Sequence, residues 1–466
     1  MSTELGTELS TAVEELERLV AASQLEQEAI RRFRRHYDQL PKDTPLPPVS
    51  LHRLREGAAD YLVLQDRLTE LAQRYQPLAK MDDERLAELE IDPRQGRIAV
   101  MVSLAAALTV YDNYLSMRSI LEDDRLRRLA NNPDVGYGIE ADELRRFVED
   151  LYSGDSRARV RKLLAWYEAD QTEPDPETAD ELFLRSAIES SVSYRYAREV
   201  TLEDKVRQRV ELARQRFVDT LDDLGKSTVG TLSKIFGNGV GLIEIRKGKL
   251  WQRQDVERHL LDLLQPLDLL LEKTPFRLTD LFIPGHFGHV AIWMGTYQEL
   301  KQLGIWEHEI FAEDRYKAYR EMVRKGHSVL EALRTGVELN TLEEFLNVDD
   351  LAVLRPVYLD QEEIPDTLIR AFRQVGKAYD FNFEVETTDK IVCSELAYHV
   401  YPGVDWQTDQ QLGRFTISPD HVASEALRDS APLKLVAFYH DGLLVDATED
   451  LALMRQLMQL PSDLSA

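Results

Sequence analysis

The chain contains a single cysteine, Cys393, in the segment DKIVCSELAYHVY. Residues 391–392 are apolar and typical of a strand end, while Leu396, Ala397 and Val400 recur at helical spacing, so we expect the cysteine to begin a helix. At that position free backbone N–H groups and the positive end of the helix dipole stabilise a thiolate. The alternative is an inert core cysteine, because an isolated buried cysteine usually behaves as a small apolar residue.

A histidine that could take the thiol proton is His289, in the segment GHFGHVAIWMG. Its alternating apolar neighbours predict a strand, and a base held within hydrogen-bond reach of a cysteine is the arrangement used in covalent catalysis. His286 stands three residues earlier, in a loop, and we expect it at the rim of the site, in contact with substrate.

We predict no metal site and no cofactor. His286, His289 and Asp280 could be read as a zinc trio, but the wider set of histidines shows no repeated ligand spacing. That wider set is His308, His327, His399, His421 and His440.

Two sequence motifs together resemble those of a known family. The matching residues are Gly288, His289, Val290, Ile292 and Gly295 in the first phrase, and Gly376, Tyr379, Asp380, Phe381, Cys393, Ser394, Glu395 and Leu396 in the second. The sequence resembles the permuted papain-like cysteine hydrolases of the YiiX/YebB type, in the NlpC-like superfamily, to which lecithin retinol acyltransferase is related. In these enzymes the histidine precedes the cysteine, as it does here, and the resemblance covers roughly residues 274–438.

The resemblance implies a role for each residue of the site. Cys393 would be the nucleophile and His289 its base. Glu331, in the phrase SVLEALRTGV, would accept the second ring N–H of His289, with Glu338 on the next strand as its competitor. Tyr379 would donate a hydrogen bond to a developing oxyanion.

We also expect substrate contacts from Asp380 and Ser394, besides those of His286. Two departures from the family pattern matter. Thr279-Asp280 stands where Gly-Asp is usual, and a charged helical stretch, residues 306–326, separates His289 from Glu331. That insertion would overhang the cleft or contact a partner, and it makes the pairing of His289 with Glu331 the least secure step.

The elements that must position these residues are predicted to form an α+β protein. Residues 1–224 show helical periodicity, with five or six helices in an all-α bundle. The stretch Ile98 to Tyr111 reads as a buried helix, too short for the roughly 20 residues of a membrane span. The apolar positions of residues 61–75 have the spacing of core residues rather than of a ligand site.

Residues 225–273 form a glycine-rich linker or lid followed by a helix over 256–273, which Pro266 bends or splits. The resemblance implies that residues 274–466 form a permuted papain-like (NlpC-like) domain, and local patterns predict strands at HVAIWMG, GVELN, LAVLRPVYL and LKLVAFYHDGLLV. In the last of these, Asp441-Gly442 predicts a hairpin turn.

Composition limits the classes of partner. A net charge of −26 over 466 residues, without a basic run, argues against nucleic acid. The first thirty residues lack the apolar run of an export signal, so we expect a cytoplasmic protein if Met1 is the native start, and a cell-envelope protein if a signal was trimmed. We expect no transmembrane segment.

These expectations lead to a cysteine hydrolase that cleaves a peptide, γ-glutamyl or isopeptide-type amide through an acyl-thiol intermediate. The substrate would be peptide-like or acyl. One alternative is a lipid-directed acyltransferase or thioesterase, for which the apolar 225–248 loop, or the helical domain, would contact a membrane surface or a protein. The other is a catalytically silent binding or scaffold protein.

Overall fold

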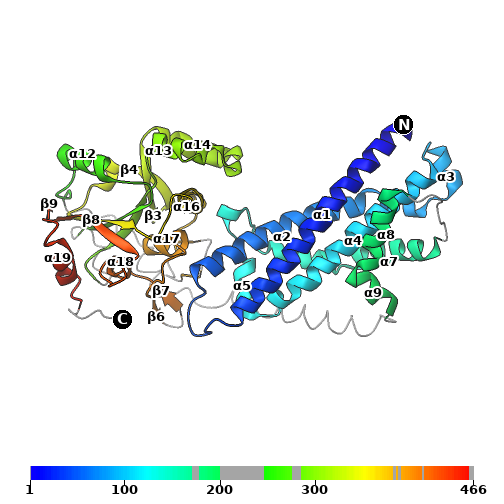
Figure 1. Ribbon diagram of the computed structural model, residues 1–466, viewed down its shortest axis with the longest axis horizontal. Coiled ribbons are helices and arrows are strands. Elements are labelled where there is room, and N and C mark those ends of the chain that lie inside the picture. The colour runs from blue at the N-terminus through cyan, green and yellow to red at the C-terminus, as the bar shows by residue number, and fades with distance from the viewer. Residues whose placement is uncertain are drawn as a thin grey trace. The chain divides into compact units, whose positions relative to one another are not determined.

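The computed structural model describes residues 2–170, 178–199, 246–274, 285–380, 385–386, 390–411 and 414–460 (Figure 1). These residues divide between two compact units. The first unit takes its described residues from Met1–Leu40, Arg53–Asn131 and Ala141–Ser227, and the second from Pro41–His52, Asn132–Glu140 and Thr228–Ala466. Two short segments of the N-terminal half therefore fold with the C-terminal residues.

The first unit is helical, as predicted, but its described part divides into more and shorter helices than the five or six expected. Polar caps create the additional breaks: the side chains of Asp82, Asp92 and Ser153 each accept a backbone N–H at the start of a new helix. The helices are α1 (Ser2–Tyr37), α2 (Pro48–Arg74), η1 (Gln76–Lys80), α3 (Asp83–Glu88), α4 (Pro93–Leu121), α5 (Asp124–Asn131), α6 (Glu143–Leu151), α7 (Gly154–Ala169), α8 (Ala179–Ser190) and α9 (Val192–Glu199).

Helix α4 is the apolar centre of this unit. Asp92 caps it and Pro93 occupies its first turn, where the missing proline N–H costs nothing. By length and composition α4 could cross a membrane, yet 72% of its most apolar 18-residue window is buried inside the protein. This burial agrees with the core helix predicted for Ile98 to Tyr111.

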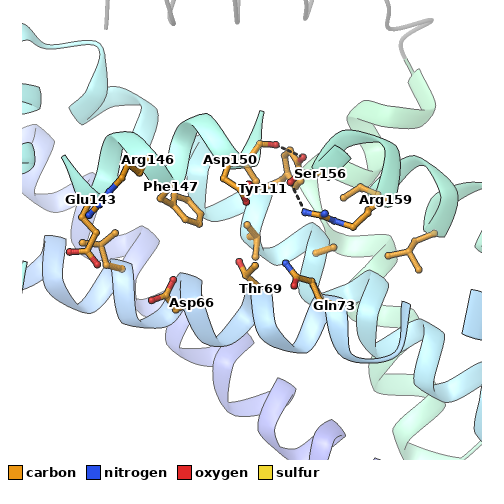
Figure 2. A pocket seen from close by; sticks show the side chains of 17 residues that line it. Asp66, Thr69, Gln73, Tyr111, Glu143, Arg146, Phe147, Asp150, Ser156 and Arg159 are labelled. Carbon is orange, nitrogen blue, oxygen red and sulfur yellow. Dashed lines mark hydrogen bonds between the residues drawn. The ribbon is translucent and has the colours of Figure 1, made fainter. Parts of the chain in front are cut away.

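Most aromatic and leucine positions of residues 61–75 are also core residues, as predicted: Tyr61, Leu68 and Leu71 are at most 1% exposed. The other side of the same helix lines a cavity of about 290 Å³ within the helical unit. Figure 2 shows polar side chains of both charges around it, among them Asp66, Glu143, Arg146, Asp150 and Arg159.

The second unit is built on a seven-stranded antiparallel sheet, which confirms the α+β fold class. The strand order is β4-β3-β2-β1-β5-β8-β9, so the chain repeatedly adds strands on either side of β1. The strands are β1 (Asp268–Lys273), β2 (His289–Trp293), β3 (His327–Leu333), β4 (Gly336–Thr341), β5 (Asp350–Pro356), β8 (Leu433–His440) and β9 (Leu443–Leu444); β6 (Asp409–Gln411) and β7 (Arg414–Thr416) form a separate pair.

The sheet has a hydrophobic core on each face, because successive side chains of a strand point to opposite sides. On β1, Leu269 and Leu271 enter one core and Leu270 enters the other. Helix α17 packs against β2 and β3. The helices of this unit are α12 (Gln254–Leu263), α13 (Tyr297–Gln302), η5 (Ile305–Glu307), η6 (Glu309–Ala312), α14 (Asp314–Arg324), α15 (Leu342–Phe345), α16 (Glu363–Phe372), α17 (Cys393–Val400), α18 (Pro419–Ser424) and α19 (Asp450–Leu457).

The segment 132–140, which includes η2 (Val135–Tyr137), is attached to this unit by a buried ion pair. Lys377 Nζ lies 2.9 Å from a carboxylate oxygen of Asp134, and both side chains are at most 2% exposed. The Arg373 guanidinium donates to the Gly136 carbonyl at 2.8 Å. Gly136 lies so close to the Arg373 carbonyl that an added Cβ would meet its oxygen at 2.1 Å.

The segment 41–52 is attached in a similar way. The Leu46 N–H donates to Glu386 Oε1 at 2.7 Å, and the Leu46 carbonyl accepts the Tyr398 hydroxyl at 2.8 Å. Tyr398 belongs to α17, the helix that begins with Cys393, so this segment supports the back of that helix.

One predicted element is wrong. We expected a helix over residues 256–273, but α12 ends at Leu263 and residues 268–273 form β1, paired with β2 and β5. Pro266 ends the helix rather than bending it. The three leucines of DLLLEK are consecutive, without alternating polar residues, because β1 is buried on both faces. The glycine-rich linker or lid lies outside the described residues as far as residue 245.

Candidate active site

Cys393 is the first residue of α17, as predicted, and only 6% of its surface is exposed. The preceding residue, Val392, is extended, and its N–H donates to Glu395 Oε2 at 2.9 Å, so the third residue of the helix caps the turn that carries the sulfur. The cysteine backbone N–H therefore belongs to the first turn, where helical N–H groups have no partner within the helix.

Tyr379 is brought to the cysteine by a short strand-like contact. Ala378 pairs with Lys390, and the Ile391 N–H donates to the Ala378 carbonyl at 2.9 Å, two residues before the nucleophile candidate. The same loop is tied to β4, because the N–H of Gly376 and the carbonyl of Lys377 both bond to Val337, at 2.8 Å each. This explains why the GKAYD phrase and the CSEL phrase belong to one site.

His289 begins β2, and its side chain meets Glu331 on β3. The ring Nε2 lies 3.0 Å from Glu331 Oε2, and the two side chains are 14% and 8% exposed. The strand register places Ala291 opposite Glu331, so His289 lies two residues along the strand and diagonal to the carboxylate. Because Nε2 is engaged, Nδ1 is the nitrogen left to face the sulfur.

The charges around His289 favour its protonated form. Burial opposes an imidazolium, but the Cys393 sulfur, through its charge and a hydrogen bond, and the Glu331 carboxylate outweigh burial and raise the pKa of His289 well above its ordinary value. Cysteine, histidine and glutamate thus interact as one chain of groups.

Tyr379 stays a hydrogen-bond donor in this environment. Burial is the largest cause that raises the pKa of Tyr379, and the nearby charges of Cys393, Glu395 and Asp380 raise it further. A hydroxyl that keeps its proton beside the sulfur can donate to an oxygen that becomes negative during a reaction.

Not every predicted site residue joins this group. Glu338 lies opposite Glu331 in the register, but its carboxylate accepts the Thr335 hydroxyl at 3.1 Å instead of meeting His289. Ser394 is 3% exposed and its hydroxyl donates to the Ile417 carbonyl at 2.7 Å. Asp380 is fully buried. Substrate contact by Ser394 and Asp380 stays a prediction.

His286 also lies apart from His289 in its contacts. Its Nε2 is 3.0 Å from Asp350 Oδ2, at the start of β5. Asp280 and Phe381, which the sequence analysis also named, lie outside the described residues.

The inserted stretch between β2 and β3 leaves the pairing of His289 with Glu331 intact. Trp306, Phe311 and Tyr316 from this stretch are at most 6% exposed and belong to the core beneath the sheet. The insertion is therefore anchored through its aromatic residues, and β2 still pairs with β3.

Sequence reasoning missed Asn340, whose Nδ2 donates to Glu331 Oε1 at 2.8 Å. The sequence held a weak signal: Glu338 and Asn340 lie two residues apart on β4, so their side chains share one face of the strand. Asn340 therefore occupies the second carboxylate oxygen and helps to orient Glu331 toward His289.

Comparison with known proteins gives a family match within the C-terminal half of the chain. Residues 264–443 match the model of a family described as permuted papain-like amidase enzymes, YaeF/YiiX, C92 family. The matched segment begins at the end of α12 and includes His289, Glu331, Tyr379 and Cys393, whereas the helical region before it is not covered. No curated protein matches the chain, and no solved structure matches it.

Proposed function

We propose that the C-terminal domain, as a permuted papain-like amidase, hydrolyses an amide bond through a thioester on Cys393. The observation that carries the proposal is the chain of contacts from Cys393 through His289 to Glu331, with the carboxylate 3.0 Å from the imidazole. A nucleophile, a base and a group that orients the base are the minimum set for this chemistry.

In the acylation step the Cys393 thiol gives its proton to His289, and the sulfur attacks the carbonyl carbon of the substrate. The resulting imidazolium then protonates the leaving nitrogen as the carbon–nitrogen bond breaks, which releases the amine. Water attacks the thioester with His289 as base, and a carboxylic acid and the free thiol result. Glu331 stabilises the imidazolium formed in each half-reaction.

Two donors support stabilisation of the tetrahedral intermediate. The Cys393 N–H is in the unpaired first turn of α17, and the Tyr379 hydroxyl keeps its proton beside the sulfur. We propose that both donate to the oxyanion, for which loss of one donor typically costs about 10²–10³-fold in rate.

The substrate is proposed to be a peptide, γ-glutamyl or isopeptide-type amide. A panel of peptidoglycan fragments, γ-glutamyl amides and acyl lipids distinguishes amide hydrolysis from acyl transfer, because only transfer requires a second acceptor and forms a new ester or amide. Release of an amine without such an acceptor is the expected result for the wild-type chain.

The test of the mechanism uses alkylation by iodoacetamide, which reports on Cys393 alone because the chain has one cysteine. We expect rapid labelling near pH 6–7 that slows strongly in His289→Ala, since a free thiol ionises only near about pH 8.5. His259→Ala, which removes a histidine bonded to Tyr439, serves as the matched control and should label like the wild type.

Slow labelling in the folded wild-type chain, with no change in His289→Ala, would identify Cys393 as an inert core residue. The amidase proposal would then fail, and the scaffold interpretation of the chain would replace it.

A further inference from the structure

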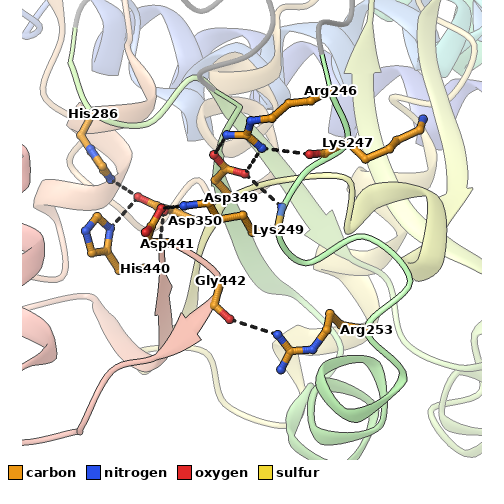
Figure 3. A network of polar contacts seen from close by, with 10 residues as sticks. All are labelled: Arg246, Lys247, Lys249, Arg253, His286, Asp349, Asp350, His440, Asp441 and Gly442. Atoms are coloured by element: carbon orange, nitrogen blue, oxygen red, sulfur yellow. Dashed lines mark hydrogen bonds and ion pairs between the residues drawn. The ribbon is translucent and has the colours of Figure 1, made fainter.

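A second cluster of histidine and carboxylate side chains lies at the end of the sheet, outside the proposed catalytic group. His286 comes from the loop before β2, Asp350 is the first residue of β5, and His440 is the last residue of β8 (Figure 3). Three different segments thus each contribute one side chain. The atoms through which these side chains could bind an ion all lie within 4.8 Å of one another.

The two imidazoles converge on one oxygen. His440 Nδ1 is 2.9 Å from Asp350 Oδ2, and His286 Nε2 is 3.0 Å from the same atom. His286 Nε2 is buried, yet it makes no hydrogen bond of standard geometry with a described residue. His286 and Asp350 are therefore in close polar contact without a well-directed N–H···O bond.

The other carboxylate oxygen of Asp350, Oδ1, accepts a different hydrogen bond. Asp350 Oδ1 accepts the Asp441 N–H at 2.7 Å, which fixes the orientation of the carboxylate and leaves Oδ2 directed at the histidines. The adjacent Asp349 is already paired with the Arg246 guanidinium, whose Nη1 is 2.8 Å from Oδ1 (Figure 3). Asp350 is thus the anionic group that the cluster itself presents.

We propose that His286, Asp350 and His440 bind one divalent transition-metal ion, with Zn²⁺ the best fit. Two imidazoles and one carboxylate form one of the common zinc ligand sets, with ligand atoms at about 2.0–2.2 Å in tetrahedral geometry. That geometry sets neighbouring ligand atoms roughly 3.3 Å apart. The two nitrogen–oxygen separations, 2.9 and 3.0 Å, are close to this value, and the separation of the two ring nitrogens is at most 4.8 Å.

The surroundings suit a metal in two further respects. Asp420 accepts the N–H groups of His286 and Phe287 at 2.9 and 2.8 Å, so the loop that presents His286 is held by its backbone. The His440 side chain is 35% exposed, whereas those of His286 and Asp350 are 11% and 5% exposed. The ion therefore has access from the side of His440, where a water could complete the coordination.

Bound metal would have a structural consequence that does not depend on the amidase proposal. His286 lies three residues before His289, in the loop that leads into β2. An ion that joins this loop to β5 and β8 would fix the start of β2, and with it the strand that presents His289 to Glu331.

The experiment titrates ZnCl₂ alone into the full chain, stripped with a chelator, by isothermal titration calorimetry. The background is Cys393→Ser, because a thiol beside an imidazole is itself a zinc-binding pair. We expect one equivalent to bind and the midpoint of thermal unfolding to rise on addition of Zn²⁺. Substitution by Co²⁺ should give the strong visible absorption of a four-coordinate site.

His440→Ala, at the most exposed ligand, should weaken binding at least tenfold and abolish the increase in unfolding temperature. His259→Ala should bind as the background does. If His440→Ala does not fold, His440→Gln gives the same comparison. No heat of binding up to millimolar Zn²⁺, or unchanged binding after loss of His440, would overturn the proposal.

Discussion

Glu331 accepts two hydrogen bonds, one at each carboxylate oxygen: from His289 at 3.0 Å and from Asn340 at 2.8 Å. A carboxylate held at both oxygens has little freedom to rotate, so it presents a fixed negative charge to the imidazole. At the scale of single residues, the proposed reactivity of Cys393 therefore depends on a side chain from β3 and its partner from β4.

Glu331→Gln should lower kcat/KM for amide hydrolysis on the order of 10²–10⁴-fold and change its pH dependence. The carboxylate raises the pKa of His289, so its removal lowers that pKa. Protonated His289 is needed to release the amine, and the protonated fraction is lost as pH rises through the pKa. The alkaline limb of the kcat/KM profile should therefore move to lower pH.

Glu338→Gln is the matched control, because Glu338 lies opposite Glu331 on β4 but bonds to Thr335. Its profile should coincide with that of the wild type. A pH profile unchanged in Glu331→Gln, or shifted equally in both variants, would remove Glu331 from the proposed role.

At the scale of elements, the order and register of strands assemble the site from residues that lie far apart in the chain. Residue types and local spacing predicted β2, β4, β5, β8 and the helix that begins at Cys393, because each has a clear period and a clear boundary. The predicted helix at the position of β1 was wrong, because a strand buried on both faces lacks the polar–apolar alternation of a half-buried strand.

The partners of the site were harder to predict than its centre. Asn340 resembles any polar residue at a strand end, and its bond to Glu331 follows only from the pairing of β3 with β4. His440 and Asp350 are 90 residues apart, so no local ligand spacing could reveal their contact. Such contacts depend on topology, which local sequence patterns do not specify.

The buried ion pair between Asp134 and Lys377 gives a prediction at this scale. Asp134→Ala should reduce the free energy of unfolding of the second unit by about 3–5 kcal/mol, because it leaves the Lys377 ammonium buried without its counter-ion. The measurement is urea denaturation followed by tryptophan fluorescence. Replacing both residues by apolar ones, as in Asp134→Leu with Lys377→Met, should recover most of the loss.

Asp314→Ala provides the comparison, because Asp314 pairs with Lys317 in a solvent-exposed ion pair. It should leave the unfolding transition unchanged. Equal effects of Asp134→Ala and Asp314→Ala would show that the Asp134 pair contributes no more than a surface contact.

At the scale of the whole molecule, the second unit is not built from contiguous sequence. It includes Pro41–His52 and Asn132–Glu140, which contact α17 and the loop that carries Tyr379. A chain that starts at residue 246 lacks both segments, and it exposes Tyr398 and the Lys377 ammonium to new surroundings.

We therefore expect residues 246–466 expressed alone to unfold at a lower temperature than the full chain and to bind the hydrophobic dye ANS. Addition of a fragment of residues 1–199 should raise the unfolding temperature of residues 246–466 part of the way to that of the full chain. The same fragment with Asp134→Ala should raise it less. An isolated 246–466 fragment as stable as the full chain would show that the two N-terminal segments are dispensable.

The separation of these contacts along the chain also affects how the protein is made. Leu46 bonds to Glu386, 340 positions later, and Asp134 bonds to Lys377, 243 positions later. A ribosome that adds about 5–20 residues per second needs roughly 20–70 s between the synthesis of Leu46 and that of Glu386. During that interval residues 41–52 and 132–140 lack their final partners. The first unit must therefore fold while these two segments, which interrupt it in sequence, still await the second unit. Translation speed and chaperones that shield exposed apolar chain should therefore influence the yield of active protein more than for an enzyme of the same size with local contacts.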